Sequence, residues 1–188
     1  MQLEPTQIYE VADEKIFVFD NVVPPNDIER FCRTLRNSSF TFLHASRKDT
    51  EYQREWAAEF DVKDFVGHSL HDYAHAAAVA FMPSTPLVCS DAFCNASTFG
   101  DMTFIHHDST KLGNISTLYY ANETWDAEWG GETLFFDDNR DARIAVGVQP
   151  GRLIVFSGQL LHRAGTPTKA CPEVRLTMSV RFEKGPTT

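Results

Sequence analysis

Three residues of this sequence have the side chains and the order along the chain that a metal site needs. His106 and Asp108 are separated by a single residue, and His162 follows much later. Two histidines and one carboxylate on one face of an octahedral ion leave other positions open, as in non-haem Fe(II) sites that bind a second ligand and O2. We therefore take His106, Asp108 and His162 as candidate metal ligands and as the candidate catalytic group.

The short motif needs support from its surroundings, because His-x-Asp pairs arise by chance and a lone histidine is often a buried core residue. Side chains alternate along a strand, so a strand here would point His106 and Asp108 to one face and His107 to the other. His162 follows an apolar segment at residues 152–156 and a short turn. We expect a closed barrel to bring His162 to the same ion.

The last apolar segment, residues 175–182, alternates strictly between polar and apolar side chains. One face carries Arg175, Thr177, Ser179 and Arg181, and the other carries Leu176, Met178, Val180 and Phe182. If the apolar face packs on helices, the polar face lines the barrel interior. A buried arginine needs an anion, and a carboxylate fits its planar guanidinium best. The alternative is a half-exposed strand with Arg175 in solvent.

Hydrophobic periodicity and turn residues predict a mainly β fold with flanking helices. We expect a strand at residues 16–20, a helix with its apolar stripe at residues 28–35, and a helical region at residues 55–81. A proline-rich break at residues 82–86 precedes a series of short predicted strands: 87–93, 102–107, 115–120, 132–136, 144–148, 152–156 and 175–182. This density of strands indicates a double-stranded β-helix, or jelly roll. We expect one domain, in which residues 1–86 support a catalytic core at residues 87–188.

Composition excludes several classes of partner. The formal net charge is -9 and no basic run is present, so nucleic acid is not an expected partner. The four cysteines form no CxxC pair, which predicts reduced thiols. The first residues are polar and acidic, and no apolar stretch is long enough for a membrane span, so we expect a cytoplasmic protein that does not bind membranes.

Together these motifs give the chain a resemblance to a known family. From about Ala92 to Phe182 the sequence resembles the Fe(II)/2-oxoglutarate-dependent oxygenases, specifically the prolyl 4-hydroxylase-like branch. Besides the histidines and Asp108, the resemblance includes residues 95–100, 118–125, 129–135 and 150–152. It implies a dioxygenase that uses Fe(II), 2-oxoglutarate and O2, releases succinate and CO2, and takes ascorbate as an optional stimulant.

The resemblance also implies roles for individual residues. His106, Asp108 and His162 would bind iron. Four further residues would contact 2-oxoglutarate: Arg175 at its C5 carboxylate, Tyr120 and Ser179 beside that carboxylate, and Asn95 near the cosubstrate. The related halogenases lack the carboxylate ligand, so an intact Asp108 implies oxygen transfer.

Two of these assignments have alternatives. Strand parity alone does not choose between Tyr119 and Tyr120, although the resemblance favours Tyr120. The family usually places its arginine or lysine closer to the distal histidine than Arg175 lies to His162. An insertion at residues 166–172 would absorb the difference, and Lys169 within it is the fallback. A second metal site on a helix carrying His68, His71 and His75 is a weaker possibility.

The function that we expect is hydroxylation of an unactivated C–H bond of a small molecule, such as a free amino acid or a biosynthetic intermediate. The alternatives are a peptidyl prolyl hydroxylase, with a peptide as partner, and a cupin-like binding module without turnover. The sequence predicts neither the substrate's identity nor the oligomeric state.

Overall fold

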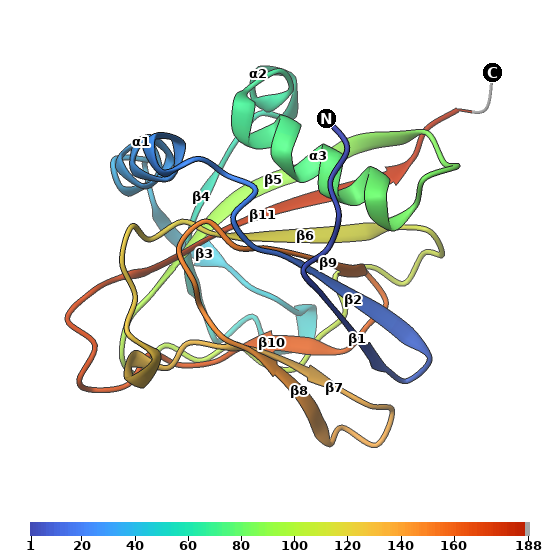
Figure 1. Cartoon of the computed structure of the whole chain (residues 1–188). Helices are drawn as coiled ribbons and strands as arrows, with labels where there is room; N and C mark the ends of the chain where they lie inside the picture. The colour runs from blue at the N-terminus through green and yellow to red at the C-terminus, as the bar shows by residue number, and fades with distance from the viewer. Residues whose placement is uncertain (187–188) are drawn as a thin grey trace.

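Two antiparallel sheets face each other and enclose the interior of the protein (Figure 1). The computed structural model describes residues 1–186. The large sheet contains eight strands in the order β1 (Gln7–Val11), β2 (Glu14–Phe19), β9 (Leu153–Ser157), β6 (Ile115–Tyr120), β11 (Arg175–Lys184), β5 (Leu87–Ser97), β4 (Glu55–Glu59) and β3 (Thr41–His44). The small sheet contains three strands in the order β10 (His162–Ala164), β7 (Thr133–Phe136) and β8 (Ala142–Val146).

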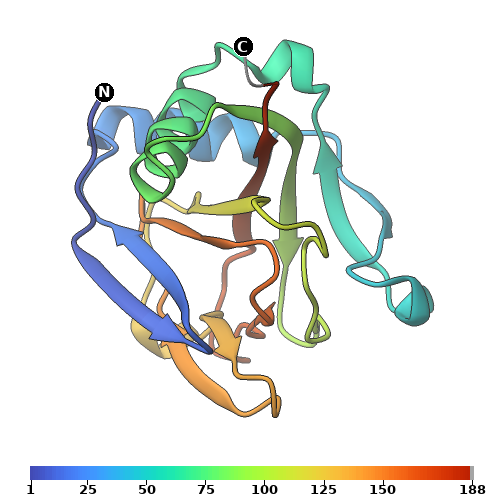
Figure 2. The same ribbon diagram turned by 90° about the vertical axis from the view of Figure 1, so that its right-hand side faces the viewer.

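Helices cover the outer face of the large sheet, on the side away from the small sheet (Figures 1 and 2). They are α1 (Pro25–Arg36), the short α2 (Val62–Phe65) and α3 (Ser69–Phe81). Pro25 stands in the first turn of α1, where its missing N–H is not needed. As the alternation predicted, the apolar face of β11 packs on these helices, in a core that contains Phe31, Leu35, Ala74, Ala77, Leu176, Met178, Val180 and Phe182.

A second apolar cluster fills part of the space between the two sheets. It consists of Val11, Ile16, Val18, Leu118, Tyr120, Phe135, Val146, Ile154, Phe156 and Leu160. The hairpin of β1 and β2 reaches from the large sheet towards the small one, and β1 contacts β8 (Figure 2). The remaining interior is lined with polar side chains, and this is where the candidate ligands lie.

The mainly β architecture confirms the prediction of a jelly-roll core with flanking helices. The expected helix at residues 55–81 is wrong at its beginning: Glu55–Glu59 is strand β4, because it pairs with β3 on one side and β5 on the other. The strand expected at residues 102–107 is also absent, apart from an isolated bridge between His106 and His162. Strands β1, β3 and β10 were not predicted. None of the helices in residues 1–186 is long and apolar enough to span a membrane.

Candidate active site

The structure brings the three candidate ligands together from two distant parts of the chain. His106 and His162 form a backbone bridge, in which each backbone N–H donates to the other's carbonyl at 3.0 and 3.1 Å. Their Nε2 atoms lie 3.6 and 3.5 Å from the two carboxylate oxygens of Asp108. One potential ligand atom from each residue lies within 4.8 Å of the others. This separation suits three ligands of a single ion.

Both histidines are held by their other ring nitrogen. Nδ1 of His106 lies 2.8 Å from the carbonyl of Phe104, and Nδ1 of His162 lies 2.9 Å from the carbonyl of Leu160. A carbonyl can only accept, so each Nδ1 carries the proton and each Nε2 is left with a lone pair. Histidine ligands of metals are usually oriented by such a contact. The donor set therefore fits a divalent ion such as Fe(II).

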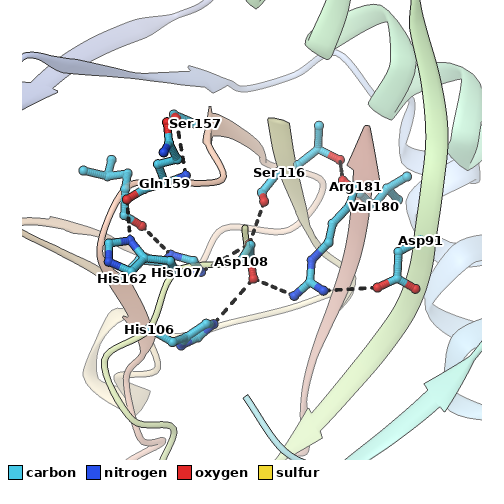
Figure 3. Close-up of polar contacts among 12 residues, drawn as sticks. Asp91, His106, His107, Asp108, Ser116, Ser157, Gln159, His162, Val180 and Arg181 are labelled. Atoms are coloured by element: carbon cyan, nitrogen blue, oxygen red, sulfur yellow. Dashed lines mark hydrogen bonds and ion pairs between the residues drawn. The ribbon is translucent and has the colours of Figure 1, made fainter. Parts of the chain in front are cut away.

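Asp108 is fixed by groups outside the triad (Figure 3). Its side chain is 3% exposed, and Nη2 of Arg181 donates to one carboxylate oxygen at 2.6 Å. The hydroxyl of Ser116 donates to the other oxygen, also at 2.6 Å. Arg181 in turn donates through Nη1 to Asp91 at 3.1 Å. Arg181 and Ser116 thus set the orientation of the carboxylate before any metal binds.

The electrostatics of the triad favour a bound cation. Burial alone would raise the pKa of Asp108, but His162, His106 and Arg181 outweigh it and hold that pKa well below its usual value. Burial lowers the pKa of His162 to about 4, so this histidine is neutral at pH 7. The pKa of His106 is raised, because the Asp108 carboxylate outweighs the effect of burial. An ionised acid beside a neutral histidine is ready to bind a metal.

Arg175 lies in the same cavity. Unlike Arg181, it is a buried cation without an acidic partner in the described part of the chain. It is 2% exposed. Its Nε donates to the carbonyl of Gly131 at 2.7 Å, and its Nη1 donates to the hydroxyl of Thr177 at 2.5 Å. Within residues 1–186 no carboxylate lies within ion-pair distance, and Glu132 acts on it only from farther away. Burial accordingly lowers the pKa of Arg175. A carboxylate entering the cavity would meet this charge.

Gly131 allows Arg175 to take this position. Its φ of +79° is a conformation that side chains other than glycine rarely adopt. A Cβ atom at this position would lie 2.9 Å from Cδ of Arg175. The sequence pattern Trp129-Gly130-Gly131 indicated only a turn, whereas the structure gives Gly131 a direct contact with the buried cation.

The other residues expected near a cosubstrate are divided between the cavity and its support. Asn95, Thr177, Ser179 and Arg181 line the cavity together with Arg175, and the alternation along β11 predicted this for the four residues of that strand. Tyr120 supports Arg175 instead: the guanidinium lies 5.3 Å from the centre of its ring. The hydroxyl of Tyr120 contacts Thr133 and the carbonyl of Val146, at 2.7 and 3.0 Å.

The structure also separates the alternatives that the sequence left open. The ring of Tyr119 packs against Phe31 of α1, on the helical side of the large sheet and away from the cavity. Lys169 is exposed on a loop. His68 accepts a hydrogen bond from the backbone N–H of Leu70 at the start of α3, as a helix cap. The histidines of that helix are not among the side chains close enough together, within residues 1–186, to hold a metal.

Sequence reasoning missed how closely Arg181 is tied to the triad. It placed Arg181 on the polar face of the last strand, where it could contact an acidic group, but did not identify Asp108 as that group. Ser116 and Asp91 were not singled out at all. The signal that could have found the pair of Arg181 and Asp108 is the alternation along the last strand. It puts two arginines on one interior face, and buried arginines need anions nearby.

Comparison with known families identifies the fold and the chemistry. Residues 94–182 match the family model described as the 2OG-Fe(II) oxygenase superfamily. This segment belongs to that superfamily. The protein is therefore an oxygenase that uses Fe(II), 2-oxoglutarate and O2. The matched segment contains all three candidate ligands and Arg175. No curated protein sequence matches the chain.

Solved structures share the oxygenase fold at low sequence identity. A Pseudomonas putida prolyl-4-hydroxylase is 16% identical with a TM-score of 0.61, and the match covers 91% of this chain and 93% of that one. SnoK, a non-heme alpha ketoglutarate dependent carbocyclase from nogalamycin biosynthesis, is 13% identical with a TM-score of 0.67, covering 90% and 79%. HygX from Streptomyces hygroscopicus, solved with nickel and 2-oxoglutarate, is 12% identical with a TM-score of 0.64, covering 92% and 84%.

Proposed function

We propose that this oxygenase hydroxylates an unactivated C–H bond of a small molecule, with His106, Asp108 and His162 as its iron ligands. The observation that carries the proposal is the juxtaposition in one cavity of the triad and a buried arginine without an acidic partner. A metal-binding jelly roll without turnover has no need for such an arginine. When bound, iron and 2-oxoglutarate together supply the oxidation, while the protein positions the substrate and excludes water.

The role of Arg175 in this proposal is to bind the C5 carboxylate of 2-oxoglutarate. Nη2 of its guanidinium donates no hydrogen bond within the described residues, and the group lies at a buried part of the cavity wall. The hydroxyls of Thr177 and Ser179 lie on the same face of β11 and can donate to the same carboxylate. Tyr120 keeps the guanidinium in place through its ring.

Asn95 is a further candidate contact for the cosubstrate. Its side-chain oxygen is buried and has no hydrogen-bond partner within residues 1–186. Such an acceptor costs free energy unless a donor reaches it. Asn95 lies opposite Thr177 in the register of β5 and β11, beside the proposed carboxylate site. A bound water or substrate hydroxyl would satisfy its oxygen, while its amide group can donate to the cosubstrate.

We favour a small-molecule substrate, on the mixed character of the cavity lining and on the likeness in fold to a biosynthetic enzyme. The cavity is bounded on one side by β4 and the segment before it, and its rim combines charged, aromatic and aliphatic groups: His44, Arg54, Glu55, Trp56 and Met102. SnoK comes from nogalamycin biosynthesis. This likeness in fold is compatible with a biosynthetic intermediate or an amino acid as substrate.

A peptidyl prolyl hydroxylase is the second candidate, on one specific observation. Strand β3 is the edge of the large sheet, and its Phe42 and Leu43 are exposed next to Trp56 at the cavity rim. An extended peptide could add to this edge by backbone pairing. The Pseudomonas putida structure shows that a prolyl-4-hydroxylase can have this fold.

The proposal is tested by measuring succinate formed from 2-oxoglutarate by the purified protein with Fe(II) and ascorbate under air. Pools of amino acids, biosynthetic intermediates and proline-containing peptides are added in separate reactions. A small-molecule pool should raise the rate above the uncoupled background. Stimulation only by peptides would support the second candidate, and no succinate under any condition would contradict both.

A further inference from the structure

One acidic side chain of the cavity belongs neither to the metal-binding triad nor to the proposed 2-oxoglutarate site. Glu55 begins β4 and lines the cavity that contains the triad. It lies opposite His44 in the register of β3 and β4, and the hydroxyl of Ser46 donates to its Oε1 at 2.6 Å. Glu55 is half-buried. A single neutral hydrogen bond leaves most of its charge uncompensated.

The other acids of the cavity are accounted for. Asp108 is paired with Arg181. Asp101 closes its own loop, since one of its oxygens accepts from the backbone N–H and the hydroxyl of Thr98 at 2.7 and 3.0 Å. Within residues 1–186 no basic side chain lies within ion-pair distance of Glu55. The neighbouring Arg54 donates to the carbonyl of Leu43 at 3.1 Å instead.

Glu55 and the triad line the same cavity. With the nearer Asp108, Glu55 contributes to raising the pKa of His106 against the effect of burial. A group bound to Glu55 would therefore lie in the same cavity as the three candidate metal ligands. In a partly buried cavity, an uncompensated carboxylate attracts a cation more strongly than it would in water.

We propose that the substrate carries an ammonium group, or a cation of similar chemistry, and that Glu55 binds it. This inference rests on the proposed small-molecule hydroxylation and specifies its substrate class. The ion pair anchors one end of the substrate at the cavity rim, so the C–H bond to be oxidised is separated from the charged nitrogen by a short chain. Glu55 is a specificity-determining residue, and neither binding of 2-oxoglutarate nor metal binding requires it.

The test compares cationic probes with neutral probes of matched length. 1-Aminopentane is paired with 1-pentanol, and 1,5-diaminopentane with 1,5-pentanediol. Their binding to protein loaded with Zn(II) and 2-oxoglutarate is measured by saturation-transfer NMR, in the wild type, in Glu55→Gln and in Glu59→Gln. Glu59 is a matched control, because it lies on the same strand but is exposed and does not line the cavity.

We expect the wild type and E59Q to bind each cationic probe about two- to fivefold more tightly than its neutral counterpart, as for a partly exposed ion pair. E55Q should lose this preference while keeping its affinity for 2-oxoglutarate. Equal binding within each pair, or no binding of any probe at millimolar concentration, would overturn the inference. Succinate formation by the unloaded wild type with Fe(II) is measured in parallel. If it is present, only the substrate class fails; if it is absent, the proposed function fails.

Discussion

Two arginines on the same face of β11 are in opposite electrostatic situations. Arg181 has its charge balanced by Asp108 at 2.6 Å and Asp91 at 3.1 Å. Arg175 is more deeply buried, yet within residues 1–186 it donates hydrogen bonds only to a carbonyl and a hydroxyl. A cation that is already paired can orient a neighbouring side chain, whereas an unpaired buried cation is a binding site for an anion. The comparison separates the group that orients Asp108 from the group that, in the proposed function, receives the cosubstrate.

This difference has an energetic consequence. Keeping an unpaired charge inside a protein is costly, and the pKa of Arg175 is lowered because burial disfavours its charged form. Binding of a dicarboxylate removes this penalty, so part of the unfavourable burial is recovered as affinity. Arg181 offers no such gain, because its partners are present before any ligand binds.

The largest effect on metal binding should come from removing Asp108, the closest acidic partner of Arg181. Without it, the charge of Arg181 is less balanced and its situation becomes more like that of Arg175. Asp108→Ala deletes one proposed ligand and leaves the guanidinium of Arg181 without its closest anion. We expect metal affinity to fall at least about 100-fold, above the range seen when only a supporting residue is removed. Calorimetric titration with Ni(II) measures it, and succinate formation should be lost as well. Unchanged metal affinity would remove Asp108 from the ligand set.

Removing Arg181 instead tests whether its pairing orients the carboxylate. Arg181→Gln should lower metal affinity by about 10- to 100-fold, as expected for a residue that holds a ligand in place. Binding of 2-oxoglutarate at saturating metal should change much less. Asp91→Asn is the matched control, because it removes the partner of Arg181 that is 45% exposed and does not touch the triad. An equal loss of affinity in both variants would argue against a specific role for the Arg181–Asp108 pair.

Acidification should weaken metal binding by protonating His106. A protonated His106 cannot bind a metal through Nε2, and its pKa is raised above the ordinary value of about 6.5. Metal affinity should therefore be full above this raised pKa and fall by about tenfold per pH unit below it. His162 titrates only at about 4 and should not contribute until the pH is much lower. Titrations with Ni(II) at several pH values check this, and a pH-independent affinity between about pH 5 and 8 would contradict it.

The smallest effect should come from pushing Arg175 out of place without removing it. Gly131→Ala introduces a Cβ atom 2.9 Å from Cδ of Arg175. We expect a several-fold rise in the KM for 2-oxoglutarate, with little change in metal affinity. Gly67→Ala is the control, because Gly67 also has a positive φ but a Cβ there would meet nothing within 4 Å. If both variants lose stability equally and neither changes KM, the contact between Gly131 and Arg175 has no functional role.

The features of the site that follow from local pattern were predictable from the sequence. The alternation of β11 correctly placed Arg175, Thr177, Ser179 and Arg181 on the interior face. The acidic partners of Arg181 were not predictable, because Asp108 and Asp91 reach it from other parts of the chain only after the sheet has formed. Local pattern indicates which face a charge occupies, but not which residue neutralises it.

The errors in secondary structure have the same physical origin. Residues 55–59 include glutamate and alanine, which favour helices, but pairing on both sides holds them in the sheet. Residues 102–107 look like a strand, yet the carbonyl of Phe104 contacts Nδ1 of His106 and the backbone makes only one bridge, to His162. At this point the backbone orients the candidate metal ligand His106 and forms no regular strand.

The most direct test of the account is the titration of 2-oxoglutarate into anaerobic, Fe(II)-loaded protein, followed by the charge-transfer absorption of the bound cosubstrate. The wild type should show a saturable signal. Arg175→Met should weaken binding by roughly 30-fold or more, since losing one partner of a buried charge pair costs at least about 2 kcal/mol. Metal affinity should be kept in this variant. The absence of a signal in the wild type, or equal affinity in R175M, would contradict the account.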